Sequence, residues 1–343
     1  MRAKRSIVPV FVPHLGCPHT CVFCDQNRIS GAESPATAQD VKNALRDALA
    51  LLPKDTEKTL AFYGGSFTAI PAKKQEELLG AAAPWLQRGD IKDIRLSTRP
   101  DAVDEETVER LKRYGVRTVE LGVQSMVPEV LEASQRGHSP EDARAAAALI
   151  KSAGFELILQ MMTGLPGDSL ERSLYTAREL IKLSPDGVRV YPTVIIRGTE
   201  LARMWEAGEY PAHTPQEAAR WGAELLDLFE AAGIPVIRFG LNPTEDLSGG
   251  EAIGGAYHPA LRDLAESVRY LKKERLLLSG EDRGETLRFA VGHGQVSAAT
   301  GQRRANVEAL RREFGVKDVK FIEKDLKPGE ILKIACNNPP DNI

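Results

Sequence analysis

The stretch that decides the fold is Pro13-His-Leu-Gly-Cys17-Pro-His-Thr-Cys21-Val-Phe-Cys24-Asp25, which holds three of the four cysteines of the chain. The spacing is C-x3-C-x2-C, directly after an apolar run at residues 7–12 that predicts a first β-strand. In a reducing compartment, clustered cysteines bind metal or do redox chemistry more often than they form disulfides. The spacing therefore predicts a metal site at the end of this strand.

Two kinds of metal site fit three such thiolates. A tetrahedral zinc site needs a fourth ligand, which His14, His19 or Asp25 can supply. Three thiolates can also hold a 4Fe–4S cluster with one iron left open for a cofactor, since such clusters are normally held by cysteine thiolates. The spacing favours the cluster and leaves zinc as the alternative. Cys336 stands alone and is interpreted as a bystander.

Composition excludes several classes of protein. The 343 residues include 45 Lys and Arg against 48 Asp and Glu, and 42% are hydrophobic. This is ordinary globular composition, which excludes intrinsic disorder, collagen-like repeats and a strongly basic nucleic-acid coat. No apolar run approaches the roughly 18 residues of a membrane span, and the N-terminal run is too short for a signal peptide. We therefore expect a cytosolic protein without membrane contact.

Strands and helices alternate along most of the chain. Strands are expected at 7–12, 59–63, 93–96, 116–121, 155–160 and 188–191, with a further run at 235–239. The intervening helices end at glycines, and Ser139 and Pro140 mark one helix start. Such alternation implies parallel strands with right-handed crossovers. Six strands before residue 195 suit a partial (β/α)6 TIM-like barrel or a doubly wound sheet.

The last hundred residues differ from the rest. Residues 241–250 and 253–258 are loop-rich, helices are expected at 260–274 and 301–314, and short strands at 286–291 and 319–323. We interpret residues 1–240 as the barrel and residues 241–343 as a small C-terminal α/β appendage of unknown role.

The cysteine loop, with Phe23 just before the third cysteine, resembles that of the radical S-adenosylmethionine superfamily. The resemblance implies that Cys17, Cys21 and Cys24 hold a 4Fe–4S cluster whose open iron chelates S-adenosylmethionine. It also implies that Phe23 lies near the adenine and that the fold is a partial (β/α)6 barrel, in agreement with the strand count.

In a β/α barrel, chemistry sits at the carboxyl ends of the strands. After the second strand, Gly64-Gly65-Ser66 matches the family's Gly-Gly-x motif, which receives the methionine amino group, and two glycines allow a ligand close to the backbone. The other candidates for cofactor binding follow the later strands: Arg99, Gln124, Ser125, Arg136 and Gln160.

These candidates suit different parts of the cofactor. Arg136 suits a carboxylate, because a guanidinium can bind one bidentately. Gln124, Ser125 and Gln160 suit ribose hydroxyls, with a satisfied structural amide as the alternative for the first. Arg99 faces either the cofactor, a substrate carboxylate or, equally well, a surface ion pair.

Several stretches resemble the Elongator catalytic-subunit family, at residues 64–67, 97–101, 120–125, 136–138, 164–167, 190–193 and 197–201. Full Elongator subunits carry an acetyltransferase domain for wobble-uridine modification in tRNA, and about a hundred residues after the barrel is short for one. Residues 124–125 and 164–167 also resemble oxygen-independent coproporphyrinogen oxidase, which acts on a small molecule.

The resemblance implies a radical enzyme. A reduced cluster cleaves S-adenosylmethionine to methionine and a 5′-deoxyadenosyl radical, which abstracts hydrogen from a substrate. The substrate is left open between a small molecule and RNA, and Tyr191, after the sixth strand, is a candidate to line its cavity. The implied partner is an electron donor such as flavodoxin or ferredoxin. A non-catalytic zinc-binding module is the alternative.

Overall fold

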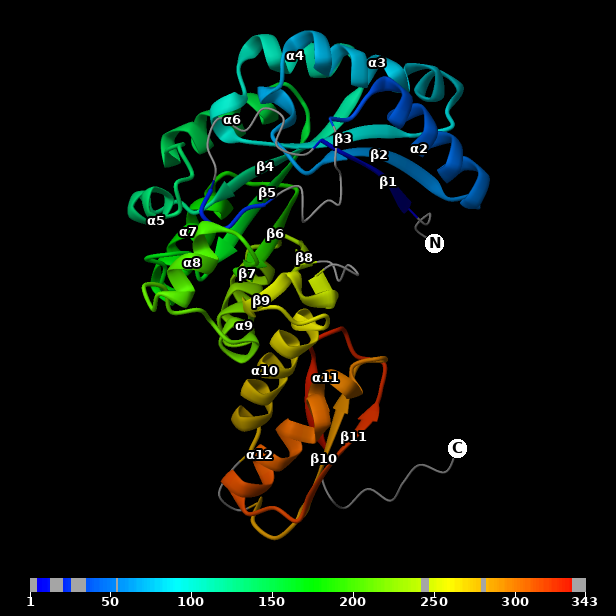
Figure 1. Ribbon diagram of the computed structural model, residues 1–343. Coiled ribbons are helices and arrows are strands. Elements are labelled where there is room, and N and C mark those ends of the chain that lie inside the picture. Colours follow the sequence, from blue (N-terminus) through cyan, green and yellow to red (C-terminus); the bar gives the residue numbers. More distant parts are fainter. Residues whose placement is uncertain are drawn as a thin grey trace. The chain divides into compact units, whose positions relative to one another are not determined.

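A seven-stranded parallel sheet, curled into a half-barrel, forms the larger part of the protein (Figure 1). The computed structural model describes residues 5–12, 21–25, 35–53, 55–241, 247–278 and 282–334. Strands follow one another in chain order, which confirms the predicted partial TIM-like barrel. The strands are β1 (Arg5–Phe11), β2 (Glu57–Tyr63), β3 (Asp93–Thr98), β4 (Val116–Gln124), β5 (Glu156–Thr163), β6 (Gly187–Pro192) and β8 (Val236–Phe239).

The helices of this part connect successive strands and begin and end at local signals. Ser139 and Asp142 form a reciprocal cap at the start of one helix, as Ser139-Pro140 predicted. Gly154 ends the same connection with a φ of +84°, a conformation that glycine adopts without strain. The helices are α2 (Ala38–Leu51), α3 (Ala72–Arg88), α4 (Glu105–Arg113), α5 (Pro128–Ala133), α6 (Pro140–Ser152), α7 (Leu170–Lys182), α8 (Glu200–Glu206) and α9 (Pro215–Ala231).

The two faces of the sheet differ in chemistry. Side chains alternate between faces along a strand, and one face carries fully buried aliphatic residues such as Leu96, Leu121 and Val190. The alternate positions carry polar or charged side chains that keep partial solvent access, such as Arg95 and Arg189. The sheet therefore presents its apolar face to the helices and a polar face to the inside of the half-barrel.

Part of the segment expected to be loop is a strand. β9 (Ala252–Gly255) pairs antiparallel with β7 (Val194–Ile196), after a short π-helical turn at Leu247–Glu251. Glycines are poor strand formers, so this pairing with a distant segment, rather than local preference, makes the strand. The prediction of continuous loop at 253–258 is corrected for residues 253–255.

The chain divides into two compact units. The first is residues 1–213 and 228–257, and the second is residues 214–227 and 258–343. The second holds a three-stranded sheet in the order β11-β10-β12, with a core that includes Leu287, Phe289 and Val307. Its elements are most of α9 together with α10 (Leu261–Leu276), β10 (Thr286–Val291), α11 (Val296–Thr300), α12 (Ala305–Phe314), β11 (Asp318–Glu323) and β12 (Ile331–Ile334).

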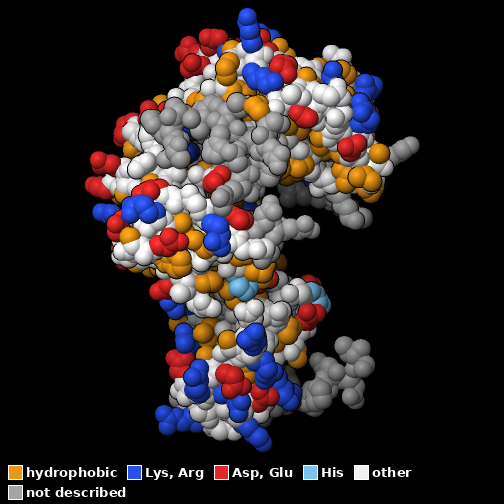
Figure 2. All heavy atoms as spheres, in the orientation of Figure 1, with side chains coloured by type: hydrophobic (Ala, Val, Ile, Leu, Met, Phe, Trp, Pro, Cys, Tyr) orange, Lys and Arg blue, Asp and Glu red, His pale blue; other side chains and the backbone are white. Residues whose placement is uncertain are grey.

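Charges of both signs are interspersed over the face of the second unit that Figure 2 shows. No helix among the described residues is long and apolar enough to cross a membrane.

Candidate functional site

A chain of hydrogen bonds joins four predicted site residues near the carboxyl ends of the strands. Ser66 Oγ accepts from the backbone N–H of Arg99 at 3.0 Å. Arg99 Nη2 donates to the carbonyl of Arg136 at 2.7 Å, and Arg136 Nη1 donates to Cys21 Sγ at 3.4 Å. All four residues are buried. The fold thus links the glycine-rich loop after β2 to the cysteine loop through two arginines.

The guanidinium of Arg136 forms hydrogen bonds with both the cysteine loop and β4. Its Nη2 donates to the carbonyl of Gly122 at 2.7 Å, while its Nε is buried without a hydrogen bond in the part of the chain described. A Cβ at Gly122 would lie 2.8 Å from this Nη2, so glycine is what gives the guanidinium room. The geometry holds a permanent positive charge beside one predicted metal ligand.

Arg99 is not at the surface. Its side chain is 2% exposed and forms a bidentate pair with Asp101, at 2.8 and 3.0 Å. Its Nη1 is buried and has no hydrogen-bond partner among the described residues. Of the interpretations that the sequence left open, the structure shows an ion pair, buried rather than exposed.

The cysteine loop is anchored by its backbone. Val22 N–H donates to the carbonyl of Ser134 at 3.2 Å, and Leu201 N–H donates to the carbonyl of Val22 at 2.7 Å. Phe23, which is partly buried, packs against two hydrophobic clusters that include Tyr210 and Leu165. Cys21 is buried and Cys24 partly exposed. The predicted ligand Cys17 and the alternatives His14 and His19 lie outside the described residues.

The end of β4 is locally strained. Gln124 has a φ of +65°, which is rare for a residue with a side chain, and it follows an irregularity in the pairing of β4 with β5. Its neighbour Ser125 is engaged by the protein: Ser125 Oγ accepts from the N–H of Val127 at 3.1 Å and lies 3.3 Å from Thr176 Oγ1. The two ribose candidates therefore differ: Gln124 has a strained backbone, whereas the hydroxyl of Ser125 is already hydrogen-bonded within the protein.

His138 is a structural histidine. Burial, and then the positive charge of Arg136, lower its pKa to about 4, so the ring is neutral at pH 7. Its Nε2 lies 3.1 Å from the carbonyl of Val123. Because a carbonyl only accepts hydrogen bonds, Nε2 carries the proton. This hydrogen bond joins the loop between α5 and α6 to β4.

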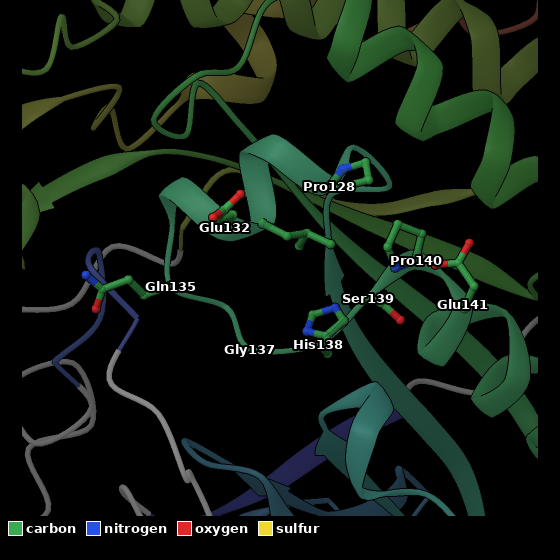
Figure 3. Close-up of a pocket in the computed structure, with 9 residues that line it drawn as sticks. Pro128, Glu132, Gln135, Gly137, His138, Ser139, Pro140 and Glu141 are labelled. Carbon is green, nitrogen blue, oxygen red and sulfur yellow. The ribbon is translucent and has the colours of Figure 1, made fainter.

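A pocket of about 670 Å³ lies beside this loop (Figure 3). Figure 3 shows Pro128 and Glu132 on α5, and Gly137, His138 and Ser139 on the segment that leads into α6. No predicted cofactor residue within the described ranges lines it. Its lining consists of Pro128, Leu131, Glu132, Gln135, Gly137, His138, Ser139, Pro140 and Glu141.

A second constellation, centred on Glu120, lies on the polar face of the sheet. Glu120 is fully buried, and five side-chain atoms approach its two oxygens, three as hydrogen-bond donors and the Nε atoms of Arg95 and Arg189 as ion-pair contacts. On Oε1 these are Tyr63 Oη at 3.1 Å, Arg95 Nε at 3.3 Å and Arg189 Nη2 at 3.1 Å; on Oε2 they are Arg189 Nε at 2.8 Å and Gln160 Nε2 at 2.9 Å. We call these five residues the Glu120 cluster.

The Glu120 cluster fixes the orientation of Gln160. A carboxylate only accepts hydrogen bonds, so the amide of Gln160 must turn its NH₂ group toward Glu120. Its carbonyl oxygen is then directed elsewhere, as an acceptor for a hydroxyl. Gln160 thus keeps the chemistry that a ribose ligand needs.

Charge and burial shape the other members of the cluster. Burial and then the charge of Glu120 raise the pKa of Tyr63, which keeps its hydroxyl protonated. Burial lowers the pKa of Arg189, but attraction from Glu120 and from Tyr191 outweighs it, so this pKa is raised. Tyr191 lies beside Arg189, and burial raises its own pKa.

Arg95, Glu120 and Arg189 were not among the site residues predicted from the sequence. A signal was available: each is a charged residue inside a strand, next to buried apolar residues and at a position that alternation assigns to one face. The register confirms the shared face, since Gly122 is opposite Gln160 and Gln160 is opposite Arg189.

Comparison with known proteins identifies the family. Residues 11–180 match the model of the Radical SAM superfamily, and residues 185–273 match that of the Radical SAM C-terminal domain. The chain belongs to the radical SAM superfamily. It is an enzyme of this superfamily, related to the Elongator branch and to archaeal tRNA-modifying enzymes.

Two relatives illustrate this branch. The chain is 37% identical to the tRNA uridine(34) acetyltransferase of Methanocaldococcus jannaschii over 253 residues, 62% of this chain and 47% of the relative. It is 31% identical to human Elongator complex protein 3 over 185 residues, 48% of this chain and 34% of that protein. The chain thus spans about half the length of the acetyltransferases that it matches.

The fold agrees with a solved structure of this branch. The structure of Elp3 from Methanocaldococcus infernus, with an N-terminal deletion, superposes with a TM-score of 0.61 at 23% identity, covering 86% of this chain and 67% of that one. This likeness supports the partial barrel.

Proposed function

We propose that this radical SAM enzyme binds a 4Fe–4S cluster through Cys17, Cys21 and Cys24, and S-adenosylmethionine at the adjoining strand ends. The observation that carries the proposal is the hydrogen-bond chain from Ser66 through Arg99 and Arg136 to Cys21. It joins the glycine-rich loop to the cysteine loop. Arg99 Nη1 and Arg136 Nε are buried in this chain and have no hydrogen-bond acceptor within the described residues. The donor set fits the carboxylate group of a cofactor beside thiolate ligands.

The chain's own residues would position the cofactor. Arg136 offers a guanidinium to a carboxylate while it also donates to Cys21. Gly64, with a φ of +94°, leaves the backbone open to the methionine amino group. Gln160, oriented by Glu120, offers its carbonyl oxygen to a ribose hydroxyl. Phe23 packs next to the third cysteine, where an adenine would lie.

When bound, the cluster and cofactor would supply one-electron cleavage of the sulfur–C5′ bond, giving methionine and a 5′-deoxyadenosyl radical that takes a hydrogen atom from the substrate. The electron comes from a donor of the flavodoxin or ferredoxin class. We propose tRNA as the substrate, because the relatives that match most of the barrel are named for uridine 34 of tRNA.

Anaerobic reconstitution tests the cluster. After addition of iron and sulfide, we expect about four iron atoms per chain and visible iron–sulfur absorbance. Cys21→Ser should abolish both, whereas Cys336→Ser, which changes a cysteine outside the C-x3-C-x2-C loop, should keep both. One zinc and no iron after anaerobic purification would refute the proposal.

Turnover tests the radical chemistry and the substrate. With dithionite and S-adenosylmethionine, the reconstituted protein should release 5′-deoxyadenosine, and Arg136→Gln should reduce the yield. Transfer RNA should bind in a salt-dependent way, because phosphate contacts release counterions. Absence of deoxyadenosine contradicts the radical function, and absence of tRNA binding contradicts the substrate alone.

A further inference from the structure

The Glu120 cluster holds more positive than negative charge. Arg95 and Arg189 both approach the single carboxylate of Glu120, at 3.3 and 2.8 Å. Arg238 lies opposite Arg189 in the register of β6 with β8, and so on the same face of the sheet. Asp93 and Glu156 share this face of the sheet but lie nearer the amino ends of the strands, where Thr59 and Thr118 donate to them. Within the Glu120 cluster itself, two guanidiniums face one carboxylate. Arg95 and Arg189 together carry one more positive charge than Glu120 neutralises, which an anionic ligand could balance.

Arg95 has donors that the protein does not use. Its Nε lies 3.3 Å from Glu120 Oε1 without forming a hydrogen bond, and its Nη1 and Nη2 form none within the described part of the chain. Its side chain is 15% exposed, and that of Arg189 is 14% exposed, whereas Glu120 is 1% exposed. The carboxylate is therefore fully buried, whereas both arginine side chains keep some solvent access.

Glu120 acts as the support of this arrangement. Its two oxygens accept hydrogen bonds from Tyr63, Gln160 and Arg189 Nη2, and they form ion pairs with Arg95 and Arg189. Glu120 therefore holds both guanidiniums in place, while Arg95 has no hydrogen bond among the described residues. The guanidinium of Arg95 is planar and is held in place beside Glu120. Its free N–H groups can therefore donate side by side to the oxygens of an oxyanion.

The position places this oxyanion beside the cofactor site. Glu120 lies opposite Ser97, one residue from the end of β3, and its partner Gln160 is a predicted ribose ligand. We propose that Arg95 and Arg189, held by Glu120, bind a phosphate group of the substrate. The assignment to phosphate rests on the proposed function, since the most abundant oxyanion of an RNA substrate is its backbone phosphate.

Binding of uridine 5′-monophosphate tests the proposal without turnover. We use the full chain, with and without reconstituted cluster, at constant ionic strength, and measure affinity by calorimetry. The monophosphate should bind at least about tenfold more tightly than uridine, because charged hydrogen bonds of this kind are strong. Arg95→Gln should remove that difference and Arg95→Lys should restore part of it. Arg117→Gln, which removes an exposed arginine from β4, should leave it unchanged.

Three results would overturn the phosphate site. They are equal affinities of the wild-type chain for uridine and its monophosphate, retention of the difference in Arg95→Gln, and binding of acetate as tight as that of inorganic phosphate. Retained binding by Arg95→Lys shows that the variant site folds. A chain that releases no deoxyadenosine but binds the monophosphate through Arg95 would contradict the proposed function and leave this site standing.

Discussion

Two glutamates, Glu120 and Glu274, are completely buried, and their surroundings are opposite. Glu120, on β4 of the first unit, accepts three hydrogen bonds and pairs with two arginines, with partners from four other strands. Glu274, on α10 of the second unit, has no hydrogen-bond partner for either oxygen among the described residues. Burial raises the pKa of Glu274 to about 8.

The difference distinguishes a buried carboxylate that the protein stabilises with donors from a buried carboxyl group that stays protonated. Desolvation is costly for both carboxyl groups, and only donors can offset it. For Glu120 the donors converge from separate strands, which requires the whole sheet. Glu274 lowers the cost by holding a proton, which removes the charge but leaves both oxygens without hydrogen bonds among the described residues. Burial alone therefore does not mark a functional group, whereas convergence does.

Removal of the Glu120 carboxylate should give the largest effect. Glu120→Leu leaves Arg95 and Arg189 partly buried with no counter-charge. We expect a loss of about 3–5 kcal/mol in the free energy of unfolding of the first unit. Hydrogen exchange of the β4 amides measures it locally. Glu120→Gln, which keeps the shape and one acceptor oxygen, serves as the control and should lose less. Unchanged protection in Glu120→Leu would contradict the role of the cluster.

The pH dependence of the second unit should reveal Glu274. Its folded pKa of about 8 lies above its ordinary value of 4.5, so the folded state favours the proton. Stability from this group is intact below about pH 4.5, falls as pH rises toward about 8 and then levels, by roughly 2–4 kcal/mol. Urea unfolding between these pH values, monitored by exchange of the α10 amides, measures the fall.

Two variants separate charge from polarity at Glu274. Glu274→Gln cannot ionise, so it should remove the fall with pH. Glu274→Leu should also remove it and, in addition, replace an unsatisfied polar group with an apolar one, which should raise stability at pH 8. A wild-type chain whose second unit is equally stable at pH 5 and pH 8 would contradict the buried, protonated carboxyl.

The contrast also explains how far the sequence predicts this molecule. Strands, helix ends and the residues after each strand follow from local patterns, such as Ser139-Pro140 at a helix start. The Glu120 cluster does not, because its partners come from β2, β3, β5 and β6, and one sequence does not show which charges meet. β9 was missed for the same reason, since its glycines are strand-forming only through pairing with β7. Cys17 stays a prediction.

A single neutral donor in the cluster should matter less than the carboxylate. Tyr63→Phe removes one hydrogen bond to Glu120 and leaves both guanidiniums in place. We expect a loss of about 1–2 kcal/mol in the first unit, the range of one hydrogen bond to a charged acceptor. Hydrogen exchange of β4 measures it, and the effect should vanish when Tyr63→Phe is made in Glu120→Leu. Additive losses would show that the tyrosine acts through other contacts.

We expect the smallest change in stability from an ion pair that is equally short but exposed to solvent. Arg275 Nε lies 2.9 Å from Glu313 in the second unit, as close as Arg189 lies to Glu120, but both side chains are nearly half exposed. Water screens such a pair, so Glu313→Gln should change stability by less than about 1 kcal/mol. Urea unfolding at low and high salt measures it. A loss as large as that of Glu120→Leu would mean that distance, rather than burial and convergent donors, sets the strength of these pairs.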